Sequence, residues 1–380
     1  MRLLVLTELF LPTKGGTAVW FSAVYPRLGG KELHIVTAEV PGSHDVDSVH
    51  VNSIHRLNLR RRSWVRPESL LMYLAFIAKS LSLVLFQRFL AIHAGRALPE
   101  GFVAWMVSVL TRLPVIIYAH GEELTTWGAG AKYRVMRFVL RHADRVIANS
   151  DYTAKELRHM GVNATKVTVI NPGVDVSRFQ PGLPHQDLRQ SLHLGPDANL
   201  MLSVGRLQKR KGFDMVIRSL PRLLERAINV HVAIIGIGEE RETLGALAAQ
   251  LGVTSRVHFL GHVLPVDLPR WYNACDLFVM PNRNIDGDTE GFGMVFLEAA
   301  ACGRCAIAGR DGGTGDAVEH GKTGYRVDGS ELSEIVEAMA TLLGDRRLRD
   351  DLARSALDRV QKKFTWDAVA AQTAALHNLM

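Results

Sequence analysis

The 380-residue sequence contains only three cysteines, Cys275, Cys302 and Cys305. An odd and small number of cysteines in a long chain argues against a disulfide framework and favours a reducing compartment. The spacing of Cys302 and Cys305 gives half of a zinc-binding pattern, but no second half completes it. A secretory signal is also lacking, because Met1 and Arg2 lead directly into the apolar run Leu3–Leu6. The sequence therefore predicts a cytoplasmic protein.

No apolar run is long and continuous enough to predict a membrane span. The longest, Leu70–Leu90, is interrupted by Lys79 and Arg88 and by polar residues, whereas a spanning helix needs about 20 nearly uncharged residues. We predict a helix that is either buried or lies on a membrane surface. The basic stretch Arg60–Arg66 precedes it and suits the anionic inner face of a membrane, where peripheral attachment is one expectation. A core helix that follows a solvated loop is the alternative.

Signatures of nucleic-acid binding are absent as well. The net charge is +7 and the sequence pI is about 9.4, which suits nucleic acid, anionic lipid or a phosphorylated substrate. Because neither zinc-finger spacing nor an aromatic-rich RNA motif occurs, we do not expect nucleic acid as a partner. With 47% hydrophobic residues, the chain is long enough for about two domains with their own cores.

Short apolar strands alternate with helical patterns along the whole sequence, which predicts parallel α/β sheets covered by helices. The expected strands of the first half are Leu3–Leu6, His34–Thr37, Val115–Ala119, Val146–Ala148 and Val167–Ile170. Those of the second half are Leu200–Val204, His231–Ile235, Val257–Leu260, Leu277–Met280 and Arg304–Ala308.

Two prolines and a glycine between Phe179 and Pro184 predict a linker between two domains of similar size. We expect a first Rossmann-like domain over residues 1–180 and a second over 181–363, facing each other across a cleft. A final helix over 364–380, with Thr365 as a cap candidate, is expected to pack back on the first domain.

The most informative stretch runs from Glu290 to Glu298. A Gly-x-Gly turn and then an apolar run separate its two carboxylates, which predicts a loop followed by a helix N-terminus. Free N–H groups at such an end suit a phosphate, and an acid beside a phosphate suits hydroxyls. A calcium loop is excluded, because the twelfth position counted from Asp286 is Leu297 rather than an acid.

Two cations follow the first strand of the second half. Arg206 comes directly after Gly205, and Lys211 stands five residues later at a predicted helix start. A guanidinium fork and a point charge together suit a diphosphate. The intervening Lys209 and Arg210 are expected to be solvated.

Weaker signals lie in the first half. Gly15 and Gly16 follow the first strand and either approach a ligand or form a plain turn. His120 follows a buried strand, where α/β active sites form, although a structural histidine is the alternative.

These segments, in this order and over nearly the whole chain, resemble retaining glycosyltransferases of family 4 with the GT-B fold. The stretch Asp288–Gly293 is similar to that of the phosphatidylinositol mannosyltransferase-like branch. The resemblance implies transfer of a hexosyl unit from a UDP- or GDP-sugar to a lipid-linked, polysaccharide or small glycan acceptor in cell-envelope synthesis. It implies no cofactor and no metal, although Asp286 and Asp288 form an Asp-x-Asp pair. The alternatives are an epimerase or phosphorylase of similar fold, or a non-catalytic protein that binds sugar nucleotides.

The resemblance also implies residue roles. Arg206 and Lys211 would bind the diphosphate, Glu290 the donor sugar and Glu298 the ribose, while His120 would contact the sugar at the reacting centre. The catalytic residues would be His120, Glu290, Arg206 and Lys211. The implied donor-binding residues are Gly15, Gly16, Gly205, Arg206, Lys211, Leu260, Val263, Glu290, Phe292, Gly293, Met294, Val295 and Glu298.

Overall fold

The computed structural model describes residues 1–379 except 14, 60–69 and 127. The predicted basic stretch Arg60–Arg66 and Lys14 of the glycine loop therefore lie outside the described residues. The chain divides into two compact units, one of Met1–Pro172 with Trp366–Met380 and the other of Gly173–Thr365. The division falls eight residues before the expected boundary at 180/181, because Gly173–Gln180 belongs to the second unit.

The first unit is built on parallel strands in the order β3-β2-β1-β4-β5-β6-β7. Their bounds are β1 Leu3–Leu6, β2 His34–Ala38, β3 Ser53–Leu57, β4 Ala91–Ala94, β5 Val115–Ala119, β6 Arg145–Ala148 and β7 Val167–Val169. The central strands β1, β4 and β5 are buried along their whole length. A strand covered on both faces must be apolar throughout, which explains their uninterrupted runs.

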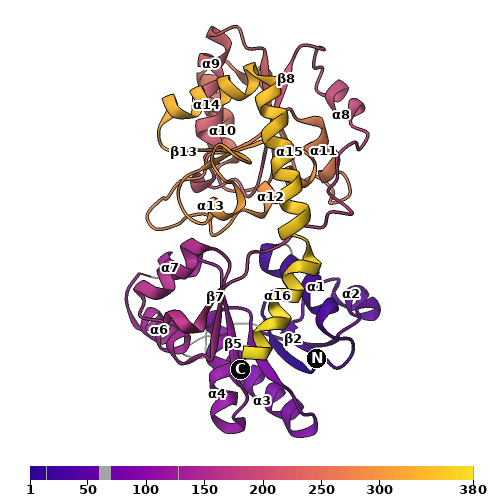
Figure 1. The fold of residues 1–380 in the computed structure, drawn as a ribbon, viewed down its shortest axis with the longest axis vertical. Coiled ribbons are helices and arrows are strands. Elements are labelled where there is room, and N and C mark those ends of the chain that lie inside the picture. The colour runs from indigo at the N-terminus through magenta and orange to yellow at the C-terminus, as the bar shows by residue number, and fades with distance from the viewer. Residues whose placement is uncertain (14, 60–69, 127, 380) are drawn as a thin grey trace. The chain divides into compact units, whose positions relative to one another are not determined.

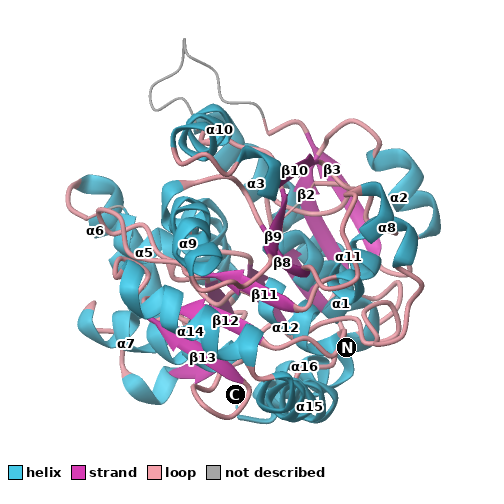
Figure 2. Ribbon diagram, turned by 90° about the horizontal axis from the view of Figure 1, so that it is seen from above, coloured by secondary structure: helices cyan, strands magenta, loops and turns pink. Residues whose placement is uncertain are grey.

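Helices surround this sheet (Figure 1; Figure 2). They are α1 Gly16–Leu28, α2 Ser43–Val49, α3 Leu70–Phe86, α4 Phe102–Thr111, α5 Glu122–Thr126, α6 Ala131–His142, α7 Asp151–His159 and α16 Trp366–Ala375, with short turns η1 Ala97–Gly101, η2 Ala164–Lys166 and η5 Leu376–Leu379. The C-terminal α16 packs against α1, where Arg27 donates to Asp367 at 2.6 Å. The last helix of the chain therefore belongs to the first unit.

The second unit repeats this plan with the strand order β10-β9-β8-β11-β12-β13, all parallel. The strands are β8 Asn199–Val204, β9 Val230–Ile235, β10 Val257–Gly261, β11 Leu277–Met280, β12 Ala306–Gly309 and β13 Gly324–Val327. The helices are α8 Gln186–Ser191, α9 Phe213–Glu225, α10 Arg241–Gln250, α11 Leu268–Ala274, α12 Met294–Ala301, α13 Thr314–Ala317, α14 Leu332–Gly344 and α15 Arg346–Lys363, with turns η3 Lys209–Lys211 and η4 Thr254–Arg256. The predicted fold class of two parallel α/β units is confirmed.

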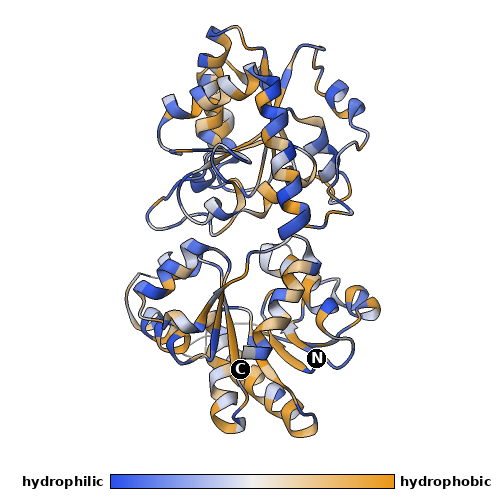
Figure 3. Ribbon diagram, viewed as in Figure 1, coloured by the Kyte–Doolittle hydropathy of each residue, from blue (hydrophilic) through white to orange (hydrophobic). Residues whose placement is uncertain are grey.

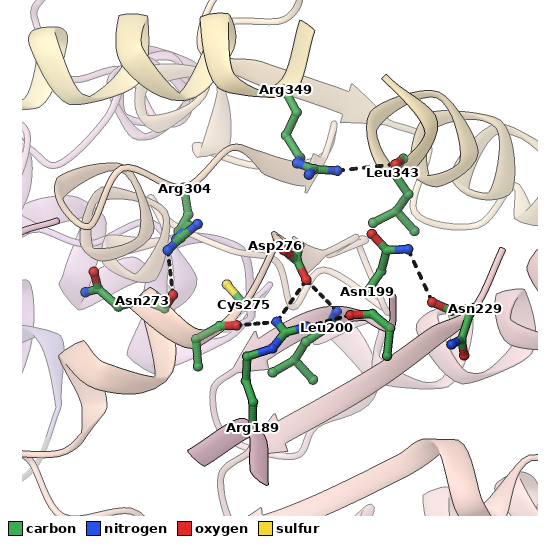
Figure 4. Close-up of polar contacts among 12 residues, drawn as sticks. Arg189, Asn199, Leu200, Asn229, Asn273, Cys275, Asp276, Arg304, Leu343 and Arg349 are labelled. Carbon is green, nitrogen blue, oxygen red and sulfur yellow. Dashed lines mark hydrogen bonds and ion pairs between the residues drawn. The ribbon is translucent and has the colours of Figure 1, made fainter. Parts of the chain in front are cut away.

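A polar network fastens the amino ends of β8 and β11 to α8 (Figure 4). The Asp276 carboxylate, just before β11, accepts from the backbone N–H of Leu200 at 2.8 Å and from Arg189 at 3.0 Å. Arg189 also donates to the carbonyl of Ala274 at 2.8 Å. The network lies at the edge of the sheet opposite to the strands' carboxyl ends.

Among the described residues, no helix combines the length and the apolar character needed to cross a bilayer.

Candidate active site

The carboxyl ends of β8 and β11 frame the candidate site of the second unit. In this sheet β8 lies between β9 and β11, so the chain reverses its direction of travel across the sheet at the β8–β11 boundary. Ligands of open parallel sheets bind at such a switch point, beyond the carboxyl ends of the strands. Arg206 and Lys211 follow β8 and Glu290 follows β11, so the fold brings the two strongest sequence motifs to the same edge.

The backbone at Gly212 allows these two loops to meet. Gly212 has φ +75°, and a Cβ atom built there would lie 2.2 Å from the carbonyl oxygen of Pro281. The N–H of Arg283 in turn donates to the carbonyl of Arg210 at 2.8 Å. A side chain at position 212 would separate the loops, so a glycine is required where the cationic turn abuts the acidic one.

Glu290 lies against two cations of the η3 turn. Arg210 donates to its Oε2 atom at 3.0 Å, and Lys211 forms an ion pair with the same oxygen. Only 12% of the Glu290 side chain is exposed. Arg210 also pairs through Nε with Asp288 at 3.0 Å. The prediction that Arg210 is solvated was wrong, since this side chain is buried between two carboxylates.

The two cations keep Glu290 ionised. Burial alone would raise the pKa of the Glu290 carboxyl, but the charges of Lys211 and Arg210 outweigh it and hold this pKa below its ordinary value. Glu290 is therefore a carboxylate at neutral pH, able to accept hydrogen bonds from hydroxyl groups.

Arg206 contrasts with the paired cations. Its side chain is exposed at the end of β8, and in the part of the chain that the structure describes its guanidinium has no hydrogen-bond partner. A guanidinium held at a strand end with its donors open suits a bidentate anionic ligand such as a phosphate. Arg206 and Lys211 thus share one loop but differ in what they contact.

The second carboxylate of the motif lies inside α12. This helix begins at Met294 after Gly293, as the sequence predicts, and Glu298 lies on its second turn. The phenol of Tyr272 on α11 donates to Glu298 at 2.7 Å. Burial raises the pKa of Glu298 to about 7, and the Tyr272 hydrogen bond opposes the rise. The free N–H groups at the start of α12 face the same strand edge as Glu290.

The glycine-rich loop after β12 packs on the backbone of Glu290. The N–H of Gly313 donates to the Glu290 carbonyl at 2.8 Å. A Cβ at Gly312, which has φ +75°, would lie 2.2 Å from that same oxygen. In this sheet β8 and β12 lie on opposite sides of β11. The loop after β12 therefore supports Glu290 from one side, and the turn with Arg210 after β8 contacts it from the other.

The other predicted donor residues of this unit line the same edge. Leu260 lies in β10 and Val263 two residues beyond its end, both half-buried. Gly205 directly follows β8. Phe292 and Gly293 form the turn before α12, and Met294 and Val295 are the first two residues of that helix. Apart from Leu260, which lies within β10, these residues follow the carboxyl ends of parallel strands.

In the first unit the switch point falls between β1 and β4. Gly15 and Gly16, at the start of α1, are exposed after β1. His120 follows the neighbouring β5 and its Nε2 lies 2.8 Å from the carbonyl oxygen of Gly95, which directly follows β4. The three predicted residues thus lie at the carboxyl edge of this sheet.

The contacts of His120 fix its tautomer and charge. Because the Gly95 carbonyl can only accept, Nε2 carries the proton and Nδ1 is the accepting nitrogen. Burial lowers the pKa of His120, which leaves the ring neutral at neutral pH. Its backbone is held too, since its N–H donates to Glu123 at 2.8 Å and its carbonyl accepts from Asn149 at 2.8 Å.

Sequence reasoning missed two partners of the predicted carboxylates. Arg210 stands in a run of three cationic residues, a pattern that is typical of a solvated turn. Tyr272 lies in a helix without any motif. Within the described ranges, no three histidine, cysteine or acidic side chains gather into a group that could hold a metal ion; the expected independence from metal stays a prediction.

Comparison with known proteins decides the family. A model described as "Glycosyl transferases group 1" matches residues 185–359, and one described as "Glycosyltransferase Family 4" matches residues 15–178. A GDP-mannose-dependent alpha-(1-6)-phosphatidylinositol monomannoside mannosyltransferase of Mycobacterium tuberculosis is 30% identical over 98% of this chain and 97% of its own. The chain belongs to this glycosyltransferase family. It is an enzyme of the transferase class, as the sequence predicted.

Other similar proteins agree with this family. A D-inositol 3-phosphate glycosyltransferase of Streptomyces bingchenggensis is 32% identical over 73% of this chain and 64% of its own. Among solved structures, Anabaena HepE in complex with UDP and glucose has a TM-score of 0.84 at 21% identity, over the full length of both chains. Sucrose-phosphate synthase from Thermosynechococcus elongatus has a TM-score of 0.82 at 21% identity, over 99% and 98% of the two chains. The structural likeness shows the shared GT-B fold.

Proposed function

We propose that this glycosyltransferase moves a hexosyl unit from a UDP- or GDP-sugar to a hydroxyl of a lipid-linked or glycan acceptor, with retention of configuration. The observation that carries the proposal is Glu290, held as a carboxylate by Lys211 and Arg210 at the β8–β11 switch point next to the exposed Arg206. Such an arrangement suits a ligand that presents both sugar hydroxyls and a diphosphate. Nucleotide sugars are ligands of this kind.

The proposed donor roles follow from charge. Breaking the anomeric C–O bond develops positive charge on the sugar and negative charge on the departing diphosphate. Arg206, Lys211 and the N–H groups at the start of α12 stabilise the negative charge on the departing diphosphate. Glu290 binds donor-sugar hydroxyls and Glu298 the ribose. Neither role requires a divalent metal.

The first unit supplies the remaining proposed contacts. The neutral ring of His120 contacts the sugar at the reacting centre, and Gly15 and Gly16 approach the diphosphate and the acceptor. Because His120 is neutral, it adds no repulsion as positive charge develops on the sugar. The leaving phosphate then accepts the proton of the acceptor hydroxyl on the same face of the sugar, which gives retention.

The names of the similar proteins support a mannosyl donor and an inositol-containing acceptor. The Mycobacterium tuberculosis relative is named as GDP-mannose-dependent and acts on a phosphatidylinositol monomannoside, and the Streptomyces relative on D-inositol 3-phosphate. HepE was solved with UDP and glucose, which supports a nucleotide-sugar donor without deciding between uracil and guanine.

A lipid-linked acceptor places the enzyme on a membrane surface, and the surface of α3 and α4 supports this. The two helices pack against each other and are largely hydrophobic in sequence (Figure 3). Exposed apolar side chains lie at their carboxyl ends, with Val109 63% and Leu110 66% exposed on α4. Leu85 is 81% and Phe86 88% exposed. The sequence from 70 to 99 has no aspartate or glutamate, and the exposed Arg88 follows α3. Exposed apolar side chains beside arginine suit an anionic bilayer.

Two experiments test the proposal. The purified enzyme is incubated with UDP-glucose or GDP-mannose, alone and with myo-inositol 3-phosphate or phosphatidylinositol, and the products are analysed for anomeric configuration. An altered sugar without acceptor would indicate an epimerase instead, and no binding of UDP or GDP by calorimetry would contradict the donor site.

Sedimentation with phosphatidylglycerol-containing vesicles tests the membrane surface. We expect Leu85→Glu/Phe86→Glu to lose binding while Val266→Glu, at an exposed apolar position of the second unit, retains it. Equal vesicle binding by both variants, or no vesicle binding by the wild type at low salt, would contradict membrane binding through α3 and α4.

A further inference from the structure

Arg210 bridges two carboxylates that the sequence motif places on one loop. Its Nη1 atom donates to Oε2 of Glu290 at 3.0 Å, and its Nε atom lies 3.0 Å from Oδ1 of Asp288. The guanidinium side chain is only 10% exposed. A planar fork that spans two acids fixes the angle between them, which a single point charge does not do.

The contacts on Glu290 are one-sided. Arg210 and Lys211 both engage Oε2, and within the described residues Oε1 has no hydrogen-bond partner. One oxygen is thus used for anchoring and the other is available to a ligand. Because both cations approach the same oxygen, the carboxylate cannot turn over without breaking two ionic contacts.

The turn that carries Arg210 is itself fixed. Its carbonyl accepts from the N–H of Arg283 at 2.8 Å, and Arg283 pairs with Asp214 in the first turn of α9 at 3.0 Å. The side chains of Arg283 and Asp214 are 13% and 27% exposed. A second ion pair therefore joins the loop after β11 to the helix that follows Arg210. The guanidinium is held by its backbone as well as by Asp288.

We propose that Arg210 is a positioning residue of the donor site: held by Asp288, it anchors Oε2 of Glu290 so that Oε1 faces a hydroxyl of the donor sugar. The inference rests on the proposed function of Glu290 as the sugar-binding carboxylate. Arg210 acts through Glu290, whereas Arg206 and Lys211 meet the diphosphate. Loss of Arg210 should therefore affect the sugar and spare the nucleotide.

Three substitutions separate charge from orientation. Arg210→Met removes both the charge and the fork, Arg210→Lys keeps the charge and cannot bridge two acids, and Asp288→Asn keeps Arg210 without its ionic anchor. Lys209→Met is the matched control, because Lys209 is exposed one position before Arg210. Thermal unfolding of each variant checks that the fold is intact.

Calorimetry with UDP and GDP, and turnover of UDP-glucose or GDP-mannose across pH, are the readouts. For Arg210→Met we expect nucleoside diphosphate affinity within about threefold of wild type and turnover reduced about 100-fold, the effect typical of a reacting group displaced by 1 Å. The acid limb of its pH–rate profile should move to higher pH, because an adjacent cation no longer favours ionised Glu290. Arg210→Lys should restore the acid limb but not the turnover, and Asp288→Asn should fall between Arg210→Met and wild type.

Two results would overturn the inference. Turnover of Arg210→Met near that of Lys209→Met would show that Glu290 needs no positioning by Arg210. A parallel loss of UDP or GDP affinity would show that Arg210 binds the diphosphate directly. Failure of the proposed function looks different, since the wild-type enzyme would then bind neither nucleotide.

Discussion

The phenol of Tyr272 donates a hydrogen bond to the carboxylate of Glu298 at 2.7 Å, between two neighbouring helices of the second unit. Tyr272 is fully buried, and the partner it fixes is the second acid of the Glu290–Glu298 motif. A hydrogen bond to the ionised form of a carboxyl lowers its pKa, so Tyr272 partly offsets the rise that burial causes in Glu298.

From this contact we predict a pH dependence of nucleotide binding. The pKa of Glu298 is raised to about 7, so the carboxylate that we propose as the acceptor for the ribose hydroxyls is lost as the pH falls below 7. Affinity for UDP or GDP should therefore decline between pH 8 and pH 6. In Tyr272→Phe the pKa rises further and the decline should begin at higher pH. Calorimetry over this range measures it.

Glu298→Gln is the control for this dependence, because an amide does not titrate. Its affinity should be weaker at pH 8 and flat across the range. A profile of Glu298→Gln that is as steep as that of the wild type would assign the titration to another group.

A second prediction concerns stability and uses the network of Asp276 (Figure 4). Asp276→Ala removes the acceptor of the Leu200 N–H and of Arg189. Hydrogen bonds to a charged group contribute about 1.5–3 kcal/mol, and partial exposure reduces this, so we expect a loss of about 2 kcal/mol in the free energy of unfolding. Urea unfolding measures it, and turnover should be unchanged at a temperature where the variant is folded.

Asp197→Ala is the matched comparison, since Asp197 is exposed in the turn before β8. We expect less than about 0.5 kcal/mol for it, as for other exposed positions. Equal losses in the two variants would mean that the Asp276 contacts do not stabilise the sheet.

The sequence revealed the central strands because burial on both faces leaves a continuous apolar run. It missed the edge strands β3 and β13, where half-exposed positions admit residues such as Arg56 and Arg326. It also missed β4, whose run includes His93. These three strands lack the continuous hydrophobic pattern on which such predictions depend, whereas the edge strands β7 and β10 retain it and were predicted.

The candidate site was predicted as far as it depends on loops that follow strands. Glu290 and Lys211 were placed on the same edge by the rule that parallel strands end together. Their pairing through one oxygen, and the burial of Arg210 between Asp288 and Glu290, could not be predicted. These contacts depend on how closely the two loops approach each other. That approach is possible because Gly212, which has no side chain, packs against the backbone of Pro281.

A third prediction concerns the attachment of the C-terminal segment. His93, buried on β4, lies 3.0 Å from the hydroxyl of Tyr25 and 3.2 Å from Nε2 of His377 in η5. Burial lowers the pKa of both histidines. Below about pH 6.5 the unfolded chain therefore binds more protons than the folded chain. The folded state, which holds both histidines neutral, consequently loses stability as the pH falls. We expect the melting temperature to fall between pH 7 and pH 5.

Substitution of His377 tests this assignment. His377→Asn removes one of the two titrating rings, so its melting temperature should depend less steeply on pH than that of the wild type. His44→Asn, at an exposed position in α2, should leave the dependence unchanged. An identical slope in all three proteins would place the acid sensitivity elsewhere, for example at the half-buried pair His231 and His258, whose Nδ1 and Nε2 atoms lie 3.0 Å apart.

The last prediction separates binding from stability at Arg206. Its side chain is exposed at the end of β8, so Arg206→Ala should change the free energy of unfolding by less than about 0.5 kcal/mol. Charge-assisted hydrogen bonds to phosphate contribute about 1.5–3 kcal/mol, so the same change should weaken UDP or GDP binding about 10- to 100-fold. Lys209→Ala removes an equal charge three residues away and, because screening by salt reduces its long-range effect, should weaken binding less than about threefold at physiological ionic strength. Calorimetry on both variants distinguishes a direct contact with the phosphate from general electrostatic attraction. Equal losses of affinity would indicate that only the net charge matters and that Arg206 does not contact the nucleotide.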